Sequence, residues 1–144
     1  MKYFLDTEFN GFQGQLLSMA LVPEDSSKPE FYKELVFSNE ELDPWVRDNV
    51  VPHLTETPVS RHEFQQALAN YLWNAGECVI VADWPDDIRY FCEYLITGPG
   101  MSINILNKIH FTLDTSINYN SKIPHNALWD ARAIRDYYAS LEKK

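Results

Sequence analysis

The run Cys78-Val-Ile-Val-Ala82 is the feature that most restricts the fold of this chain. It is short and wholly apolar, which predicts a strand that is buried on both faces. Patterns typical of helices lie on either side of it in the sequence. The run therefore indicates an α/β protein, in which helices pack on a central sheet.

Three further strands are predicted before this run. We expect them over Lys2–Asp6, Leu16–Val22 and Phe31–Phe37, with a turn at Asn10-Gly11 and a loop over Pro23–Pro29. Because short connections join the three strands in sequence, they favour an antiparallel meander.

Helical signals follow the meander. Ser60-Arg-His-Glu63 has the spacing of a capping box, and Gly76 marks the end of the helix that it opens. Pro85 opens a second helix, which the Gly98-Pro-Gly100 sequence breaks. The remaining predicted elements are a strand over Ile109–Leu113 and a helix over Ala127–Glu142. The order βββ-α-β-α-β-α predicts an α/β fold with a mixed central sheet.

Length and charge restrict the class of protein. The 144 residues suffice for a single domain and are too few for two. The net charge of −9 by itself argues against a protein that binds polyanions or a membrane surface. Cys78 and Cys92 make neither a disulfide framework nor a zinc cluster. Since no signal peptide and no membrane-spanning run is found, we expect a cytoplasmic protein without a membrane partner.

The first acidic motif is Asp6-Thr-Glu8, at the end of the first predicted strand. Residues two apart in a strand point to the same face, so both carboxylates should project together. Adjacent carboxylates repel unless they are protonated or bridged by a cation. A hard divalent ion such as Mg²⁺ or Mn²⁺ would bridge them. Taken alone, the pair is also compatible with a solvated strand end.

The second motif, Asp83-Trp-Pro-Asp-Asp87, directly follows the buried strand and opens a helix. Open α/β sheets tend to place their binding sites at such positions. Acidic residues in a first helical turn also stabilise the helix, by about 0.3–1 kcal/mol each. Helix stabilisation alone is expected to account for at least one of these acids.

The third motif is His125-Asn-Ala-Leu-Trp-Asp130. Asn126 can cap the last helix, which places Asp130 in its first turn and His125 in the loop before it. A histidine beside carboxylates is a candidate general base because its pKa lies near neutrality. No role is assigned to the remaining histidines, which have no acidic pattern nearby: His53, His62 and His110.

Together the three motifs resemble those of the DEDDh family of 3′–5′ exonucleases, which have the ribonuclease H-like fold. The resemblance extends from Lys2 to Tyr138, and the run from His125 to Ala131 is its most specific part. The opening Asp6-Thr-Glu-Phe-Asn-Gly11 is similar to that of a small bacterial exoribonuclease subfamily. The family's fold implies a ribonuclease H-like mixed sheet.

The resemblance also implies roles for individual residues. The four metal-binding carboxylates of the family match Asp6, Glu8, Asp87 and Asp130, and the general base matches His125. Four carboxylates are the right number for two Mg²⁺ or Mn²⁺ ions about 3.5–4 Å apart. The implied reaction is hydrolysis from a free 3′ end to 5′-monophosphates, without a covalent intermediate.

The second motif departs from the family pattern. Asp83 stands where many relatives have Asn, and Pro85 interrupts the run. Asp87 fits the spacing to the following Ile-Arg-Tyr-Phe better than Asp86 or Asp83 does. Asp83 could instead cap the helix or hold a metal-bound water.

Substrate contacts are less defined. Phe9 and Trp84 are candidates for stacking on a terminal base, and Thr7 and Phe9 for contacts through their backbone groups. Trp129 is a further stacking candidate, and Phe9 is preferred to both tryptophans. The cations near the third motif could contact phosphates: Lys122, Arg132 and Arg135.

We expect a partner that is single-stranded RNA or DNA with a free 3′ end, with RNA favoured on the subfamily resemblance only. The acidic surface favours short or single-stranded ends, and relatives are often homodimers. The alternatives are an exodeoxyribonuclease, an endonuclease of the ribonuclease H type and a catalytically silent binding module. The spacing from His125 to Asp130 speaks against the endonuclease, and the presence of all five expected side chains speaks against the silent module.

Overall fold

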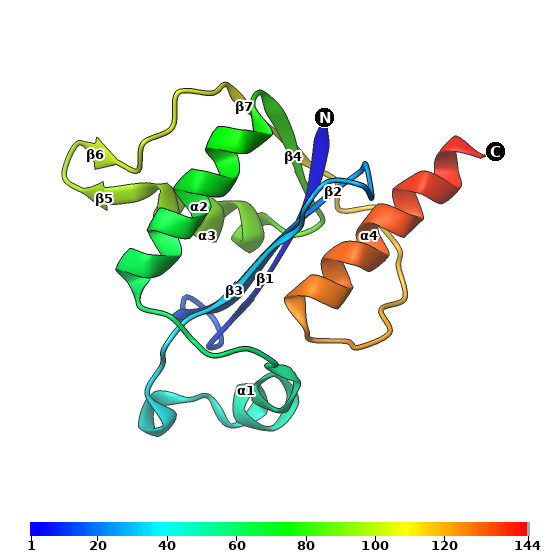
Figure 1. The fold of residues 1–144 in the computed structure, drawn as a ribbon. Helices are drawn as coiled ribbons and strands as arrows, with labels where there is room; N and C mark the ends of the chain where they lie inside the picture. Colours follow the sequence, from blue (N-terminus) through cyan, green and yellow to red (C-terminus); the bar gives the residue numbers. More distant parts are fainter. Residues whose placement is uncertain (144) are drawn as a thin grey trace.

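A mixed five-stranded sheet forms the centre of the fold (Figure 1). The computed structural model describes residues 1–143. The strand order is β3-β2-β1-β4-β7, in which β1, β2 and β3 are antiparallel and β4 and β7 run parallel to β1. The strands are β1 Lys2–Phe9, β2 Leu16–Pro23, β3 Phe31–Glu34, β4 Cys78–Ala82 and β7 Ile109–Leu113. The predicted meander and mixed sheet are thus confirmed.

Helices cover both faces of this sheet. Helices α2 (Arg61–Ala75) and α3 (Pro85–Leu95) pack on one face, and α4 (Ala127–Glu142) packs on the other (Figure 1). The run Cys78–Ala82 that predicted this layering is β4, and its residues are buried except for the half-buried Val79. Within residues 1–143, no helix has both the length and the apolar character needed to cross a membrane.

The predicted helix ends are correct where a polar cap defines them. The Ser60 side chain accepts a hydrogen bond from the backbone N–H of Glu63 at 3.1 Å and begins α2. Gly76 ends α2 with a φ of +73°, a conformation that favours glycine. The Asn126 side chain accepts from the N–H of Trp129 at 3.1 Å and begins α4.

Four predicted boundaries are wrong. Strand β1 continues past Asp6 to Phe9, and β2 continues one residue past Val22 to Pro23. Strand β3 ends at Glu34 instead of Phe37, because the backbone N–H of Val36 donates to the carbonyl of Val59 at 3.0 Å and leaves the sheet. Helix α3 ends at Leu95, before the expected glycines. The chain continues there into a two-stranded hairpin, β5 (Ile96–Gly98) and β6 (Met101–Ser102).

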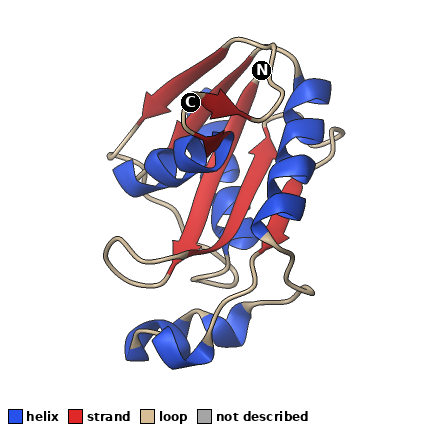
Figure 2. Ribbon diagram, turned by 90° about the vertical axis from the view of Figure 1, so that its left-hand side faces the viewer, coloured by secondary structure: helices blue, strands red, loops and turns tan. Residues whose placement is uncertain are grey.

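A short helical segment that was not predicted lies at one end of the sheet (Figure 2). It contains helix α1 (Pro44–Asn49) and two 3-10 turns, Asn39–Glu41 and Val51–His53. Asp43 caps α1, since its carboxylate accepts from the N–H groups of Trp45 and Val46. Asn10, in the turn after β1, accepts from the N–H of Asp43 at 2.7 Å, so α1 is tied to the end of β1.

Alternate residues of β1 serve the two faces of the sheet. Tyr3 and Leu5 belong to the apolar core that contains α2 and α3, whereas Phe4 packs with Ile134 of α4. Small side chains let α4 approach the sheet closely on its face: Ala20 of β2 and Ala127 and Ala131 of α4 are fully buried together. This close approach brings the first turn of α4 beside the middle of β1.

Candidate metal centre

Asp6 and Glu8 lie on the face of β1 that is covered by α4. They alternate with Leu5 and Thr7, and each faces a small residue of β2 across the antiparallel pair: Ala20 lies opposite Asp6, and Ser18 lies opposite Glu8. The prediction that both carboxylates project together is therefore confirmed by the register of the strands.

Asp130 completes a first group of three carboxylates. One oxygen from each of Asp6, Glu8 and Asp130 lies within 4.8 Å of the others. Because Ala127 and Ala131 bring the start of α4 against the sheet, a residue 124 positions away in sequence reaches the carboxylates of β1.

A second group of carboxylates shares Asp6. Here the partners are Asp83, directly after β4, and Asp87, in the first turn of α3, again with one oxygen of each within 4.8 Å. The parallel register places Phe4 beside Val81, so Asp6 and Asp83 follow at the same level of the sheet. Asp83 thus belongs to the cluster. It does not cap α3, because the N-cap residue is Trp84 and makes no side-chain cap.

Asp86 is the acid of the second motif whose hydrogen bonds lie within and next to the first turns of α3. Its carboxylate accepts from Arg89 one turn later at 3.3 Å and from the indole N–H of Trp84 at 3.2 Å. Asp87 is 3% exposed and points into the cluster, in agreement with the spacing argument that preferred it to Asp86.

Three of the five carboxylates, Asp6, Asp87 and Asp130, are buried, and the other two, Glu8 and Asp83, are half-buried. Asp6 and Asp130 are each 6% exposed. Oδ2 of Asp6 and Oδ1 of Asp130 accept no well-aligned hydrogen bond from any residue between 1 and 143. No Lys, Arg or His of that range forms an ion pair with any of the five carboxylates: Asp6, Glu8, Asp83, Asp87 and Asp130.

Burial and mutual repulsion raise the pKa values of these acids. Burial is the larger cause for Asp6, whose pKa lies well above its usual value, and the charges of Asp87 and Glu8 add to it. Burial, then Asp130, raises the pKa of Glu8 to about 9, and burial raises that of Asp87 to about 8. Neighbouring carboxylates that resist ionisation in this way are stabilised in their charged form by a cation.

The donor atoms fit a hard divalent ion. All of them are carboxylate oxygens, which suit Mg²⁺ or Mn²⁺ and not the softer metals that prefer sulfur or imidazole. Two oxygens in the cluster lack a partner among residues 1–143, and a bound cation would supply one. The two groups that share Asp6 offer places for two ions.

His125 lies at the edge of the first group in an unusual backbone conformation. Its φ is +69°, in the left-handed region that non-glycine residues rarely adopt. Its backbone N–H donates to Oδ2 of Asp130 at 3.2 Å, which links the histidine loop to a carboxylate of the cluster. Strain of this kind often accompanies functional positions.

Asn126 anchors the loop that carries His125. Its oxygen caps α4, and its amide donates to the carbonyl of His53 at 2.8 Å. The short helical segment of residues 39–53, which is tied to Asn10 at its other side, therefore also reaches the start of α4. Its Trp45 ring lies edge-on to the His125 ring, with the ring centroids 5.1 Å apart, and Trp45 is 54% exposed.

The predicted substrate residues lie in three different environments. The buried Thr7 hydroxyl donates to Oδ1 of Asp87 at 2.5 Å. Phe9 packs on Tyr90 of α3 with a centroid distance of 4.8 Å, away from the carboxylate face. Trp84 is 58% exposed. Their roles in substrate binding stay predictions.

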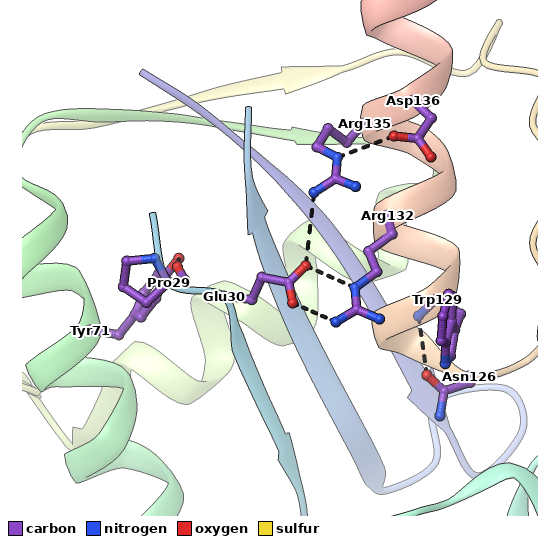
Figure 3. A network of polar contacts seen from close by, with 8 residues as sticks. All are labelled: Pro29, Glu30, Tyr71, Asn126, Trp129, Arg132, Arg135 and Asp136. Atoms are coloured by element: carbon purple, nitrogen blue, oxygen red, sulfur yellow. Dashed lines mark hydrogen bonds and ion pairs between the residues drawn. The ribbon is translucent and has the colours of Figure 1, made fainter. Parts of the chain in front are cut away.

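Of the cations near the third motif, two are already paired (Figure 3). Glu30 accepts two hydrogen bonds from Arg132, at 2.8 and 2.6 Å, and lies 3.9 Å from Arg135. Lys122 instead lies over the ring of Trp129, 5.9 Å from its centroid, and makes no ion pair within the part of the chain that the structure describes.

Two neighbours of the site were missed by sequence reasoning. Trp45 is in a helix of six residues that showed only a local signal, Asp43 followed by Pro44. Tyr119 lies in the segment before α4, and its pKa is raised by burial and then by the charge of Asp6. No local pattern marks Tyr119, because its place beside Asp6 depends on the path of the loop.

Comparison with known proteins identifies no family. No protein-family model matches the sequence, and no curated protein matches it significantly. The class of protein is instead given by the structure. It is an α/β protein with a mixed five-stranded sheet and a largely buried carboxylate cluster on one face.

Proposed function

We propose that this chain is a metal-dependent 3′–5′ exonuclease of the ribonuclease H-like fold. The observation that carries the proposal is the pair of carboxylate groups that share Asp6, with His125 at their edge. The strand order β3-β2-β1-β4-β7 is compatible with that fold. The three sequence motifs, which resemble those of DEDDh exonucleases, contribute every residue of the two groups.

The five carboxylates would hold two divalent ions. When bound, such ions lower the pKa of a water molecule and offset negative charge on a phosphodiester. Asp6 is the common residue of both groups, with Glu8 and Asp130 on one side and Asp83 and Asp87 on the other.

His125 is the proposed general base. Its loop is fixed at two points, because its own N–H binds Asp130 and the next residue, Asn126, binds the carbonyl of His53. A base that is held in place can accept a proton from water attacking the terminal phosphodiester. The products are a nucleoside 5′-monophosphate and a strand that is shorter by one nucleotide.

Thr7 and Trp45 would support the reaction in different ways. The Thr7 hydroxyl fixes the rotamer of Asp87 through its 2.5 Å hydrogen bond. Trp45 presents an exposed indole beside His125, where the terminal nucleotide must lie if His125 is to act on its phosphodiester. We therefore assign Trp45, ahead of Trp84, to stacking on the terminal base.

Single-stranded RNA is the proposed substrate, on the similarity of the first motif to an exoribonuclease subfamily. The test is a panel of 5′-labelled RNA, DNA and duplexes with 3′ overhangs, incubated with Mg²⁺ or Mn²⁺. Laddering from the 3′ end supports an exonuclease, and the relative rates rank the two sugars. Internal fragments at early times would instead favour an endonuclease, and no cleavage with either metal would favour a binding module.

A further inference from the structure

A surface hollow of about 390 Å³ lies between α2 and the strands β1 and β3, on the side of the sheet opposite to the carboxylate cluster. Its lining includes Tyr3, Phe31 and Tyr71, together with Lys28, Lys33 and Asn70. Tyr3 and Asp6 are on opposite faces of β1, so the sheet separates the hollow from the candidate metal centre. A volume of this size is typical of small-molecule sites.

The charge of the hollow is opposite to that of the chain as a whole. The sequence has 21 acidic and 12 basic residues, but none of the eleven lining residues is Asp or Glu. Lys28 and Lys33 make no ion pair with any residue from 1 to 143. Two free ammonium groups without a nearby lining carboxylate favour an anionic ligand.

Two acids adjoin the hollow in sequence, Asp25 and Glu30, and neither forms an ion pair with Lys28 or Lys33, although the charge of Lys28 contributes to the lowered pKa of Asp25. Glu30 adjoins the hollow in sequence, but its carboxylate is held by Arg132 of α4, on the other side of the sheet (Figure 3). Asp25 accepts hydrogen bonds from the N–H and hydroxyl of Ser27, at 2.9 and 2.7 Å. Neither acid therefore neutralises the two lysines by direct contact.

Aromatic side chains form the floor of the hollow, and Tyr71 offers most of its exposed aromatic surface because Tyr3 and Phe31 are each 4% exposed. The ring of Tyr71 lies 5.9 Å from that of Tyr3 and 5.5 Å from that of Phe31, measured between centroids. The Tyr71 hydroxyl donates to the carbonyl of Pro29 at 2.7 Å, which links the ring to the loop before β3. Such a floor favours a ligand with a flat apolar ring.

Two amides on α2 add hydrogen-bonding groups to the wall. Asn70 and Asn74 are one turn apart and both line the hollow. The Asn74 amide N–H donates to the backbone carbonyl of Asn70 at 2.9 Å, which leaves its oxygen as an acceptor. The side chain of Asn70 has no hydrogen-bond partner within the described residues 1–143. Free amide groups suit the polar edge of a heteroaromatic base.

We propose that this hollow binds a nucleoside 5′-monophosphate, with the phosphate at Lys28 and Lys33 and the base against the aromatic floor and the α2 amides. An anion without a ring would leave the floor uncovered, and a neutral aromatic molecule would not use the lysines. The site is independent of the proposed exonuclease activity, since it lies across the sheet and needs no metal.

Calorimetric titration of 5′-AMP in EDTA tests the proposal, because metal-free carboxylates repel phosphate and leave the hollow as the anion site. We expect saturable binding that weakens by about tenfold or more in a Lys28→Glu/Lys33→Glu variant. A matched reversal on the other face, Lys122→Glu, should leave it unchanged. Adenosine and inorganic phosphate should each bind at least about tenfold more weakly than 5′-AMP.

Photocrosslinking locates the ligand separately from the substitutions. The wild-type protein, irradiated with 8-azido-AMP in EDTA, should be labelled on the peptide that contains Asn70 and Asn74 of α2. Absence of saturable 5′-AMP binding, equal binding by the double variant, equal binding of inorganic phosphate, or labelling confined to α4 would each overturn the proposal.

Discussion

The two faces of β1 differ in the polarity of the side chains that they bury. On the α2 side, Tyr3 and Leu5 pack in a continuous apolar core. On the α4 side, Phe4 is equally buried among apolar residues, but Asp6 and Glu8 follow it in a cluster of five acids. Burial of the apolar residues on the α2 side stabilises the folded state, whereas burial of the acids on the α4 side destabilises it.

The acids of the cluster are therefore candidates for a role other than stabilising the fold. Buried carboxylates without a cation or full hydrogen bonding destabilise a protein, and stability alone would favour their replacement. Five carboxylates from three separate parts of the sequence, three of them buried and two half-buried, meet at one place. The proposed divalent ions would compensate these charges.

The largest expected effect is on catalysis. His125→Ala and Asp6→Asn should each lower metal-dependent nucleotide release by about 10²–10⁴-fold, because one removes the proposed general base and the other the carboxylate shared by both groups. The measurement is the rate of 5′-monophosphate release from a single-stranded RNA, and circular dichroism should confirm that both variants are folded. An unchanged rate in either variant would remove that residue from the mechanism.

Substitutions on the two faces of β1 should change stability in opposite directions. Leu5→Ala removes a fully buried side chain and should lower the free energy of unfolding by about 2–5 kcal/mol. Asp6→Asn removes a buried, repelled charge and should raise it by roughly 1–2 kcal/mol when no metal is present. Urea unfolding in EDTA near pH 8 measures both, and a destabilised Asp6→Asn variant would contradict the account.

The two exposed tryptophans near the site should differ in substrate binding. Trp45→Ala should weaken it by about 5- to 150-fold, the range for loss of one base-stacking contact, whereas Trp84→Ala should have a smaller effect. The comparison should be repeated with an RNA whose 3′-terminal nucleotide lacks its base. The effect of Trp45→Ala should disappear on that RNA, and its persistence would show that Trp45 acts only by supporting His125.

Metal-free protein should lose stability as the pH rises. The pKa of Glu8 is raised from 4.5 to about 9 and that of Asp87 from 3.8 to about 8, so between these values the folded state binds more protons than the unfolded state. Protonation therefore stabilises the fold fully below about pH 4, and this contribution is lost as the pH rises to 9. Melting temperatures in EDTA from pH 5 to 9 should fall more steeply than those with Mg²⁺, and parallel profiles would argue against a cation at the cluster.

Local patterns predicted the elements that carry most of the cluster. The apolar run of β4, the Ser60 and Asn126 caps and the alternation of Asp6 and Glu8 depend on neighbouring residues, and each prediction is confirmed. Contacts between distant segments could not be predicted in the same way. The place of Asp83 in the cluster depends on the register of β4 with β1, which the sequence spacing does not specify.

The helical segment around α1 also could not be predicted from local sequence patterns. The six-residue helix is too short to show an amphipathic period. The segment that contains it is held by two hydrogen bonds, one between Asp43 and Asn10 and one between His53 and Asn126. The approach of Trp45 to His125 follows from these two ties. Such a contact can be recognised only when all the partners are placed in space.

The proposed function requires the acidic cluster to bind two divalent ions that share Asp6. Mn²⁺ binding followed by electron paramagnetic resonance tests it without any assumption about the substrate. We expect two saturable Mn²⁺ ions for each wild-type chain, the loss of both in Asp6→Asn, and the loss of one in a Glu8→Gln variant. Absence of saturable Mn²⁺ binding, or binding that Asp6→Asn leaves intact, would contradict it.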